Sequence, residues 1–210
     1  MIGVVATHRA TAFPAVGGRR LDPLARLALA AAEPLAAGLP PGTALAVGTA
    51  YGSVTATQRL LDGMRADGDQ LASPAAFTAS TLSHATGALS EALKLHGPVA
   101  TISQGPSSAL AAVRWAWCQL AIGRATAALV VAGDHPTDWC RGVIGSLGDG
   151  SWQRQPCATA WLLRVDAGRE LRPRGAAPVL PCTELPVRLP AGPVLLSAEP
   201  AVAMWLGPQG

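Results

Sequence analysis

Apolar and polar residues follow one another along the chain in blocks that predict strands alternating with helices. Short blocks that are apolar almost throughout are typical of strands buried on both faces of a sheet. Longer blocks in which apolar residues recur every three or four positions predict helices. This alternation predicts an α/β domain with a mixed, mostly parallel sheet of about five strands and helices on both faces. The expected strands are residues 2–7, 43–49, 99–103, 126–132 and 158–165, and the expected helices begin at Pro23, Val54, Thr81 and Ser107.

Residues with strong capping or turn preferences mark the boundaries of these elements. Asp22 is a favourable N-cap, and Pro23 suits the first helical position because proline lacks an N–H. The turn 48–53 joins a strand to a helix, as phosphate-binding loops do, but it has neither their Lys nor the spacing of a dinucleotide fingerprint. We interpret it as a close backbone turn that glycine permits. Residues 73–77 and 134–138 are expected to be loops.

The composition shifts toward Pro, Arg and Gly beyond residue 166. Such a change is typical of a domain boundary, so we expect a domain at 1–168 and a Pro-rich tail at 169–210. The tail is expected to be mainly irregular and to pack on the domain or on a partner. Within it, 193–197 has the apolar pattern of a strand, and 201–206 is expected to form a short helical or packing segment.

The bulk composition excludes several classes of protein. Half of the 210 residues are hydrophobic and 14% are charged, against about 25% in typical domains, which indicates a large buried interface. A net charge of +3 from 16 basic and 13 acidic residues is too diffuse for nucleic-acid binding. No apolar run approaches the roughly 18 residues of a membrane helix, so no membrane insertion is expected. The four cysteines lack CxxC or metal-ligand spacing, so we expect reduced thiols, no metal and a cytoplasmic protein.

The segment 97–110 combines a strand, a Gly-Pro turn and the start of an apolar helix. Backbone N–H groups at such a helix N-terminus can face an anion or a carbonyl oxygen, and many acyl-transfer enzymes hold their nucleophile there. Ser107 and Ser108 open the helix, and His135 follows a neighbouring strand, at the edge where α/β sheets bind ligands. One alternative is therefore a Ser-dependent hydrolase or acyltransferase using Ser107 or Ser108 with His135. The other is that the serines cap the helix.

The segment 97–110 resembles the active-site segment of β-ketoacyl synthases, whose pattern is roughly G-P-x-x-T-x-D-T-A-C-S-S-x-L, and aligns with it without a gap. The strand and turn at 47–53, the residues 74–77 before the next helix, and the strand end at 130–134 resemble the same family. The resemblance covers residues 1–166. It implies half of a thiolase-like fold, the N-terminal half.

Two departures from this family bear on catalysis. Pro106 stands where the family has its nucleophilic cysteine, and proline supplies neither a nucleophile nor an N–H for the oxyanion hole. The family's two catalytic histidines lie in the C-terminal half of the fold, and no histidine of this sequence falls in a matching motif. Ser103, Gln104 and Gly105 also replace the usual Asp-Thr-Ala. We therefore expect no condensing activity by the family's mechanism.

The helix that follows this turn is apolar nearly all round, which predicts burial on most of its sides. One sheet covers one side, so the tail or another subunit is expected to cover the other. The strand at 99–103 matches the strand at the family's dimer edge, a second indication of association. The expected interface residues are Val99, Thr101, Ile102, Trp115 and Trp117, and the expected pocket residues are Phe77, Ser103, Gln104 and Gly105.

The resemblance implies a non-catalytic homologue similar to the chain-length factors, which lack the active cysteine and pair with a catalytic ketosynthase to shape its product pocket. It implies a polyketide, aryl-polyene or fatty-acid-like pathway, and a ketosynthase or a second copy as partner. An acyl carrier protein is a further expected partner, and no cofactor is expected. Chain-length factors often carry Gln at the cysteine position, whereas Gln104 lies earlier. Two alternatives stay open: the Ser-dependent enzyme, and a module that binds an acyl chain or an acyl carrier protein.

Overall fold

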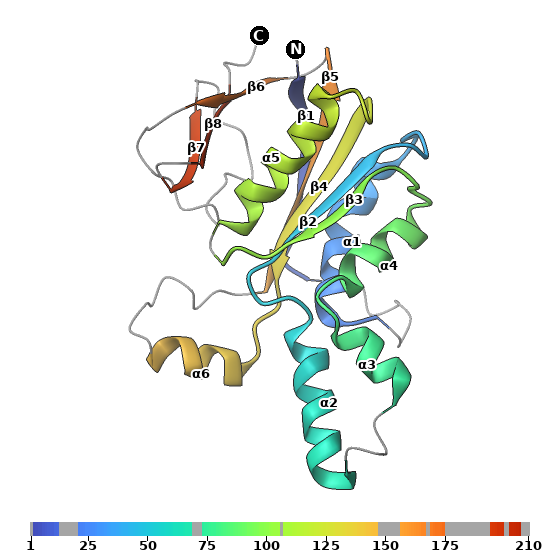
Figure 1. Cartoon of the computed structure of the whole chain (residues 1–210), viewed down its shortest axis with the longest axis vertical. Coiled ribbons are helices and arrows are strands. Elements are labelled where there is room, and N and C mark those ends of the chain that lie inside the picture. The colour runs from blue at the N-terminus through green and yellow to red at the C-terminus, as the bar shows by residue number, and fades with distance from the viewer. Residues whose placement is uncertain are drawn as a thin grey trace.

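The computed structural model is a twisted sheet with helices on both faces (Figure 1). The described strands form one eight-stranded sheet in the order β3-β2-β4-β5-β1-β6-β8-β7. They are β1 (Ile2–Ala10), β2 (Ala44–Gly48), β3 (Val99–Ile102), β4 (Ala127–Asp134), β5 (Cys157–Val165), β6 (Arg169–Arg174), β7 (Val194–Glu199) and β8 (Val202–Leu206). The structure describes residues 2–12, 21–68, 73–105, 107–146, 156–166, 169–174, 194–199 and 202–206.

Parallel pairing is confined to one side of this sheet. β2 lies between β3 and β4 and is parallel to both, whereas β5 is antiparallel to β4 and to β1. The five strands from β3 to β1 form the mixed sheet that the sequence predicts, with less parallel pairing than expected. The reason is that β5 starts at the edge where β4 ends, with Cys157 opposite Asp134, and runs back beside it. A parallel pair would need a crossover connection instead.

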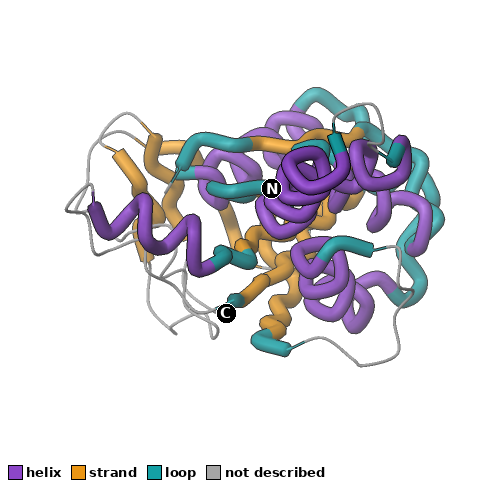
Figure 2. The backbone as a smooth tube through the Cα atoms, turned by 90° about the horizontal axis from the view of Figure 1, so that it is seen from below, coloured by secondary structure: helices purple, strands orange, loops and turns teal. Residues whose placement is uncertain are grey.

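Helices α1 and α4 cover one face of the sheet, and α5 covers the other, as the sequence predicts. β2 and β4 are therefore buried along most of their length. α2 and α3 pack on each other beyond the end of the sheet, and α6 lies apart from the helices that cover it (Figure 1, Figure 2). The helices are α1 (Pro23–Ala36), α2 (Val54–Asp67), α3 (Pro74–Ser80), α4 (His84–Ala92), α5 (Ser108–Ala121) and α6 (Asp138–Ser146).

The core has one apolar layer on each face of the sheet. On one face, Leu110 of α5 packs in a cluster with Trp161 of β5. On the other, Leu27 of α1 and Leu89 of α4 pack in a cluster with Leu45 of β2. Burying such a side chain fully stabilises the fold by about 1.5–3 kcal/mol. These layers fix the helices on the sheet and so determine which strand ends meet at its edge.

Two helices begin with the same short signature. The Leu24 N–H donates to the Asp22 carboxylate at 3.0 Å, and Pro23 is the first residue of α1, as predicted. Ser73 and Pro74 repeat this arrangement at the start of α3. The prediction of a loop at 73–77 is wrong, because a capping residue followed by proline starts a helix there.

Part of the tail extends the sheet beyond β1. β6 pairs with β1 and β8, and β7 pairs with β8, all antiparallel. The strand expected at 193–197 is confirmed as β7. The segment 201–206, expected to be helical or a packing segment, contains strand β8 because β6 and β7 pair with it on both sides. β7 and β8 also contact α5, so the tail covers part of the side that faces away from the sheet. The division into 1–168 and 169–210 stays a prediction.

Candidate functional site

The carboxyl ends of β2, β3 and β4 meet at one edge of the sheet, the place where α/β proteins bind ligands. The turn 49–53 follows β2, the elbow 103–107 follows β3, and the loop 135–137 follows β4. Pro106 lies outside the described residues. The geometry of the elbow is therefore given by the residues on either side of it.

Gly105 and the first turn of α5 shape the elbow. Gly105 has a φ of 55°, in the left-handed region that glycine adopts without steric cost. The Ser107 N–H donates to the Gln104 carbonyl at 3.1 Å, and the Ser108 N–H donates to the Gly105 carbonyl at 3.2 Å. An oxyanion hole requires backbone N–H groups that are free to face a substrate oxygen. These two N–H groups instead bind carbonyls of the elbow itself.

The Ser108 hydroxyl joins the elbow to the end of β2. Its oxygen accepts a hydrogen bond from the Gln104 N–H at 2.9 Å. The hydroxyl points its proton toward the carbonyls of Gly105, at 2.7 Å, and Thr49, at 3.0 Å. Ser108 is 4% exposed and Ser107 is 9% exposed. A nucleophilic serine needs an accessible oxygen and a base that takes its proton, whereas Ser108 is buried and bonded to backbone.

β2 approaches the start of α5 closely at Gly48. A Cβ atom at Gly48 would lie 2.5 Å from the Ser108 carbonyl oxygen and 2.8 Å from the Ser108 carbonyl carbon. A side chain does not fit at that separation in a close-packed interior. Glycine at this position therefore allows the helix to sit directly against the strand end, where the Thr49 carbonyl reaches the Ser108 hydroxyl.

The Asp134 carboxylate holds the turn after β2. One of its oxygens, Oδ1, accepts hydrogen bonds from the Thr49 hydroxyl at 2.6 Å, the Ala50 N–H at 2.9 Å and the Tyr51 N–H at 3.0 Å. The Gly52 N–H donates to the Thr49 hydroxyl oxygen at 2.9 Å. A phosphate-binding loop would offer these N–H groups to a ligand. Because they already bind Asp134 and Thr49, the turn serves as a structural connection.

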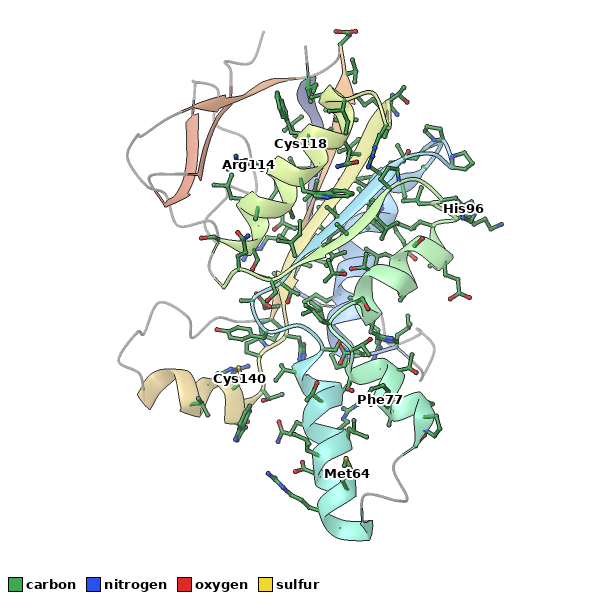
Figure 3. All side chains as sticks on the ribbon, in the orientation of Figure 1. Met64, Phe77, His96, Arg114, Cys118 and Cys140 are labelled. Atoms are coloured by element: carbon green, nitrogen blue, oxygen red, sulfur yellow. The ribbon has the colours of Figure 1, made fainter. Side chains whose placement is uncertain are left out.

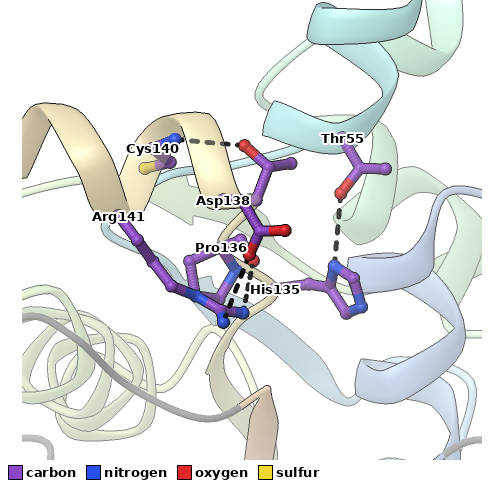
Figure 4. A network of polar contacts seen from close by, with 7 residues as sticks. Thr55, His135, Pro136, Asp138, Cys140 and Arg141 are labelled. Atoms are coloured by element: carbon purple, nitrogen blue, oxygen red, sulfur yellow. Dashed lines mark hydrogen bonds and ion pairs between the residues drawn. The ribbon is translucent and has the colours of Figure 1, made fainter.

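His135 hydrogen-bonds to α2. Its Nδ1 lies 3.2 Å from the Thr55 hydroxyl oxygen (Figure 4). Downstream, the Arg141 guanidinium donates to the Pro136 carbonyl at 2.9 Å, which connects α6 to the loop after β4. It also lies 3.6 Å from the Asp138 carboxylate, which is fully exposed. Ser108 hydrogen-bonds within the elbow and to β2, while His135 hydrogen-bonds to α2. The Ser–His pair of the alternative enzyme stays a prediction that these contacts do not favour.

Asp22 is a buried carboxyl near two histidines, a grouping that the sequence reasoning missed. Burial raises the pKa of Asp22, and the Leu24 N–H, the His84 and His135 rings and the Ser53 hydroxyl lower it in part. Burial also lowers the pKa of His135 below its ordinary value of 6.5, although Asp22 acts in the opposite direction. These residues lie far apart in the sequence, so no local pattern predicts that they meet. The sequence indicated only that Asp22 is a favourable helix cap.

The low pKa of His135 predicts a loss of stability in mild acid. Unfolded His135 takes up a proton near pH 6.5, while the folded form resists it to a lower pH. The contribution of His135 to folding stability is therefore complete above pH 6.5, and it decreases as the pH falls below that value. Thermal unfolding between about pH 8 and about pH 5 measures this change.

In the His135→Gln variant, the melting temperature is expected to depend less on pH than it does in the unsubstituted protein. His96→Gln, at an exposed site, is the control, and equal profiles for the two variants would contradict the prediction.

Two grooves flank β3, the edge strand of the sheet. The groove on the α4 side has a volume of about 560 Å³, and that on the α5 side about 380 Å³. Four of the five predicted interface residues line one or the other, as does the predicted pocket residue Gln104. The α4-side groove is lined by Leu82, Ser83, Thr86, Gly87, Val99, Ala100 and Thr101, and the α5-side groove by Ile102, Gln104, Ala111, Arg114, Trp115 and Cys118.

The remaining predicted residues lie elsewhere. Trp117 is half-buried and packs against the α5 side of the core. Ser103 is exposed and Gly105 half-buried, both in the elbow. Phe77 is 64% exposed on α3, well away from Arg114 and Cys118 on α5 (Figure 3). The resemblance indicated Phe77 as a pocket residue, but it does not line either groove beside β3.

Cysteine and metal chemistry have little support at this edge. Cys118, Cys140 and Cys157 are free thiols, and Cys182 lies outside the described residues. Burial raises the pKa of the Cys140 thiol and the nearby Asp134 raises it further, so the thiol stays protonated. Among the described residues, no three His, Cys, Asp or Glu side chains are grouped as metal ligands would be. Within the same part of the chain, each helix is too short or too polar to cross a bilayer.

The family model for the N-terminal domain of β-ketoacyl synthases matches residues 5–180. The chain belongs to the β-ketoacyl synthase family. The comparison with curated proteins finds no match. The ketosynthase resemblance and the α/β fold class are thus confirmed, on a match that includes the elbow, the Asp134 turn and β3.

Solved structures of this family share the fold. A chain from the complex of the ketosynthase ApeO with its chain length factor ApeC, from Xenorhabdus doucetiae, aligns with a TM-score of 0.72 at 16% identity, over 98% of each chain. The ishigamide ketosynthase/chain length factor aligns with a TM-score of 0.60 at 21% identity, over 70% of this chain and 45% of that one. The third structure is a type II polyketide synthase acyl-carrier protein in complex with its ketosynthase (AntDE:AntF). It aligns with a TM-score of 0.58 at 18% identity, over 70% of this chain and 48% of that one. This chain thus spans nearly all of the first chain and about half of the length of the other two.

Proposed function

We propose that this chain is a catalytically inactive member of the β-ketoacyl synthase family that pairs with a catalytic ketosynthase or with a second copy of itself. The pathway would be of the polyketide, aryl-polyene or fatty-acid-like type. The observation that carries the proposal is Pro106 at the position of the family's nucleophilic cysteine. An acyl carrier protein is a second proposed partner, as the family resemblance implies.

The hydrogen bonds around the elbow support inactivity. The side chain at 106 offers no nucleophile, and the neighbouring Ser108 oxygen is buried and bonded to backbone groups. The N–H groups of Ser107 and Ser108 bind carbonyls of the elbow. Acyl transfer requires a nucleophile and a polarised carbonyl, and the described residues of this elbow are arranged for neither.

The exposed edge of β3 supports pairing. β3 ends the sheet, with β2 on one side of it. An edge strand leaves unpaired backbone groups that another strand can bind, unless the protein blocks it. Val99 on this edge is 45% exposed, and neither Lys nor Pro interrupts the strand to block pairing. The two grooves beside β3 would receive side chains from a partner whose own strand runs along it.

The solved relatives supply a second line of support. The first structure is a complex of a ketosynthase with its chain length factor, and this chain covers 98% of the chain to which it aligns. A chain of this length therefore occurs within a ketosynthase assembly. The second relative is also a ketosynthase and chain length factor pair.

Co-expression with full-length ketosynthases from the same genome tests the proposal. The measurement is the mass of the purified complex by light scattering, with condensing activity assayed for each protein alone and for the pair. We expect a stable complex in which activity requires the ketosynthase. Condensing activity of this chain alone, or a monomer that binds neither a ketosynthase nor a second copy, would refute it.

Val99→Lys is expected to weaken this pairing at least about tenfold, equivalent to about 1.4 kcal/mol. A lysine on an edge strand opposes the approach of a second strand because its charge would have to be buried. Leu61→Lys on α2 is a matched control, since Leu61 is also 45% exposed but lies away from β3. The measurement is the dissociation constant of each variant for the partner that binds the unsubstituted chain. Equal weakening by the two substitutions would count against β3 as the interface.

A further inference from the structure

The groove on the α5 side of β3 combines an apolar surface with polar side chains. Ile102 and Trp115 are half-buried and pack against the core, so their positions in the groove are fixed. Arg114 and Cys118 lie about one turn apart on α5 (Figure 3), and Gln104 of the elbow lines the same groove. Arg114 and Gln104 are both exposed. The groove therefore presents hydrogen-bond donors beside apolar side chains.

Arg114 is the only charged residue in the segment 97–123, which contains β3, the elbow and α5. Within the described part of the chain, its guanidinium has no ion pair or hydrogen bond, unlike those of Arg65 and Arg141. A guanidinium presents N–H donors in a planar fork that matches the two oxygens of a carboxylate. The charge and shape of this group therefore favour an Asp or Glu side chain as its ligand.

A second copy of this chain does not supply that carboxylate. Two copies paired antiparallel along β3 would be related by a two-fold axis perpendicular to the sheet, so each would offer the other the same surface. Both α5 helices would lie on one side of the joined sheet, and the segment 97–123 contains no Asp or Glu. Each copy would instead bring a second Arg114, and like charges brought together across an interface oppose association.

We propose that Arg114 and Gln104 bind an Asp or Glu side chain of a different protein that pairs along β3. The inference rests on the proposed function, and it selects a catalytic ketosynthase over a second copy as the pairing partner. Apolar residues beside that carboxylate would cover Ile102 and Trp115 and exclude water. The ion pair would then be stronger than one on an open surface, because screening by water is reduced. Arg114 is in this way a residue that determines partner specificity.

Arg114→Glu in the full chain tests the proposal against the ketosynthase that co-purifies with the unsubstituted chain. We expect the dissociation constant of that complex to rise at least about tenfold, equivalent to about 1.4 kcal/mol. Arg114→Lys keeps the charge but loses the planar fork, so it should weaken the complex less than the glutamate does. Arg124→Glu is the matched control, because Arg124 is also exposed but lines neither groove beside β3. Equal weakening by the two glutamate substitutions would overturn the proposal.

A charge swap identifies the carboxylate on the partner. Each Asp and Glu on the partner's strand that pairs with β3, and on the helix packed beside that strand, is replaced by Arg in turn. One of these replacements is expected to restore binding of the Arg114→Glu variant, because the two charges then exchange places. If none of them restores binding, the proposal is wrong.

The behaviour of the unsubstituted chain alone separates this inference from the proposed function. A stable homodimer that Val99→Lys dissociates would overturn the inference and leave pairing along β3 in place. A monomer that binds no ketosynthase would refute both. Titration with decanoate tests for a small acid as the ligand. Decanoate binding that Arg114→Glu abolishes, together with an unchanged ketosynthase complex, would assign the groove to a small acid and overturn the inference.

Discussion

Asp134→Ala is expected to lower the free energy of unfolding by about 3–5 kcal/mol. The substitution removes an acceptor of three hydrogen bonds, from the Thr49 hydroxyl and from the Ala50 and Tyr51 N–H groups. Hydrogen bonds to a charged group contribute about 1.5–3 kcal/mol each, and bonds that share one acceptor do not add fully. Urea unfolding of the purified protein measures the loss.

Two further variants make the Asp134 result specific. Asp134→Asn keeps one acceptor oxygen in nearly the same place and is expected to lose less stability than the alanine variant. Asp138→Ala should leave the unfolding curve nearly unchanged, because the Asp138 side chain is 100% exposed. Should Asp138→Ala and Asp134→Ala unfold at the same urea concentration, the hydrogen bonds of the Asp134 carboxylate to the turn after β2 would have no role in stability.

Gly48→Ala is expected to destabilise the protein by about 1–3 kcal/mol, the usual cost of overpacking a core. The new Cβ would lie 2.5 Å from the Ser108 carbonyl oxygen, which belongs to helix backbone and has little freedom to move. The start of α5 must therefore shift away from β2, which also lengthens the Ser108–Thr49 hydrogen bond. Urea unfolding measures the change in the free energy of unfolding. The amide chemical shifts of the elbow report the displacement of the start of α5.

Gly63→Ala serves as the matched control for Gly48. Gly63 lies inside α2, and a Cβ there would meet nothing within 4 Å. Glycine weakens a helix interior by roughly 0.5–1 kcal/mol relative to alanine, so this variant should be slightly more stable than the parent. Opposite signs for the two glycine substitutions are the expected outcome. Two stabilised variants would mean that β2 and α5 do not depend on close contact.

The order and type of most elements followed from the sequence because their apolar patterns are strong. The start of α1 was predictable from Asp22 and Pro23, since capping is a local property. The same local rule applied to Ser73 and Pro74, and α3 was missed because its apolar pattern is too short to suggest a helix. Strand β8 was missed for another reason: its form depends on pairing with β6 and β7, which no local pattern records.

The position of the candidate site could be predicted from the sequence, but the hydrogen bonds within it could not. The elbow could be located from the Gly-Pro turn and the helix that follows it. The role of Ser108 depended on Thr49, a residue distant in the sequence that only the fold brings near. The same holds for Asp134 with the turn after β2, and for Asp22 with Ser53 and His84. Residue types alone allowed a serine nucleophile and a histidine base, although the capping preference of serine already favoured a structural role.

The contacts that hold the elbow have a consequence for this edge of the sheet. Ser108, Thr49 and Asp134 connect the ends of β2, β3 and β4 through hydrogen bonds that do not involve the side chain at position 106. Architecture and chemistry at this edge therefore depend on different residues. Under the proposed function, replacement of the nucleophile in a ketosynthase would end catalysis and leave these hydrogen bonds, and with them the shape of this edge, in place.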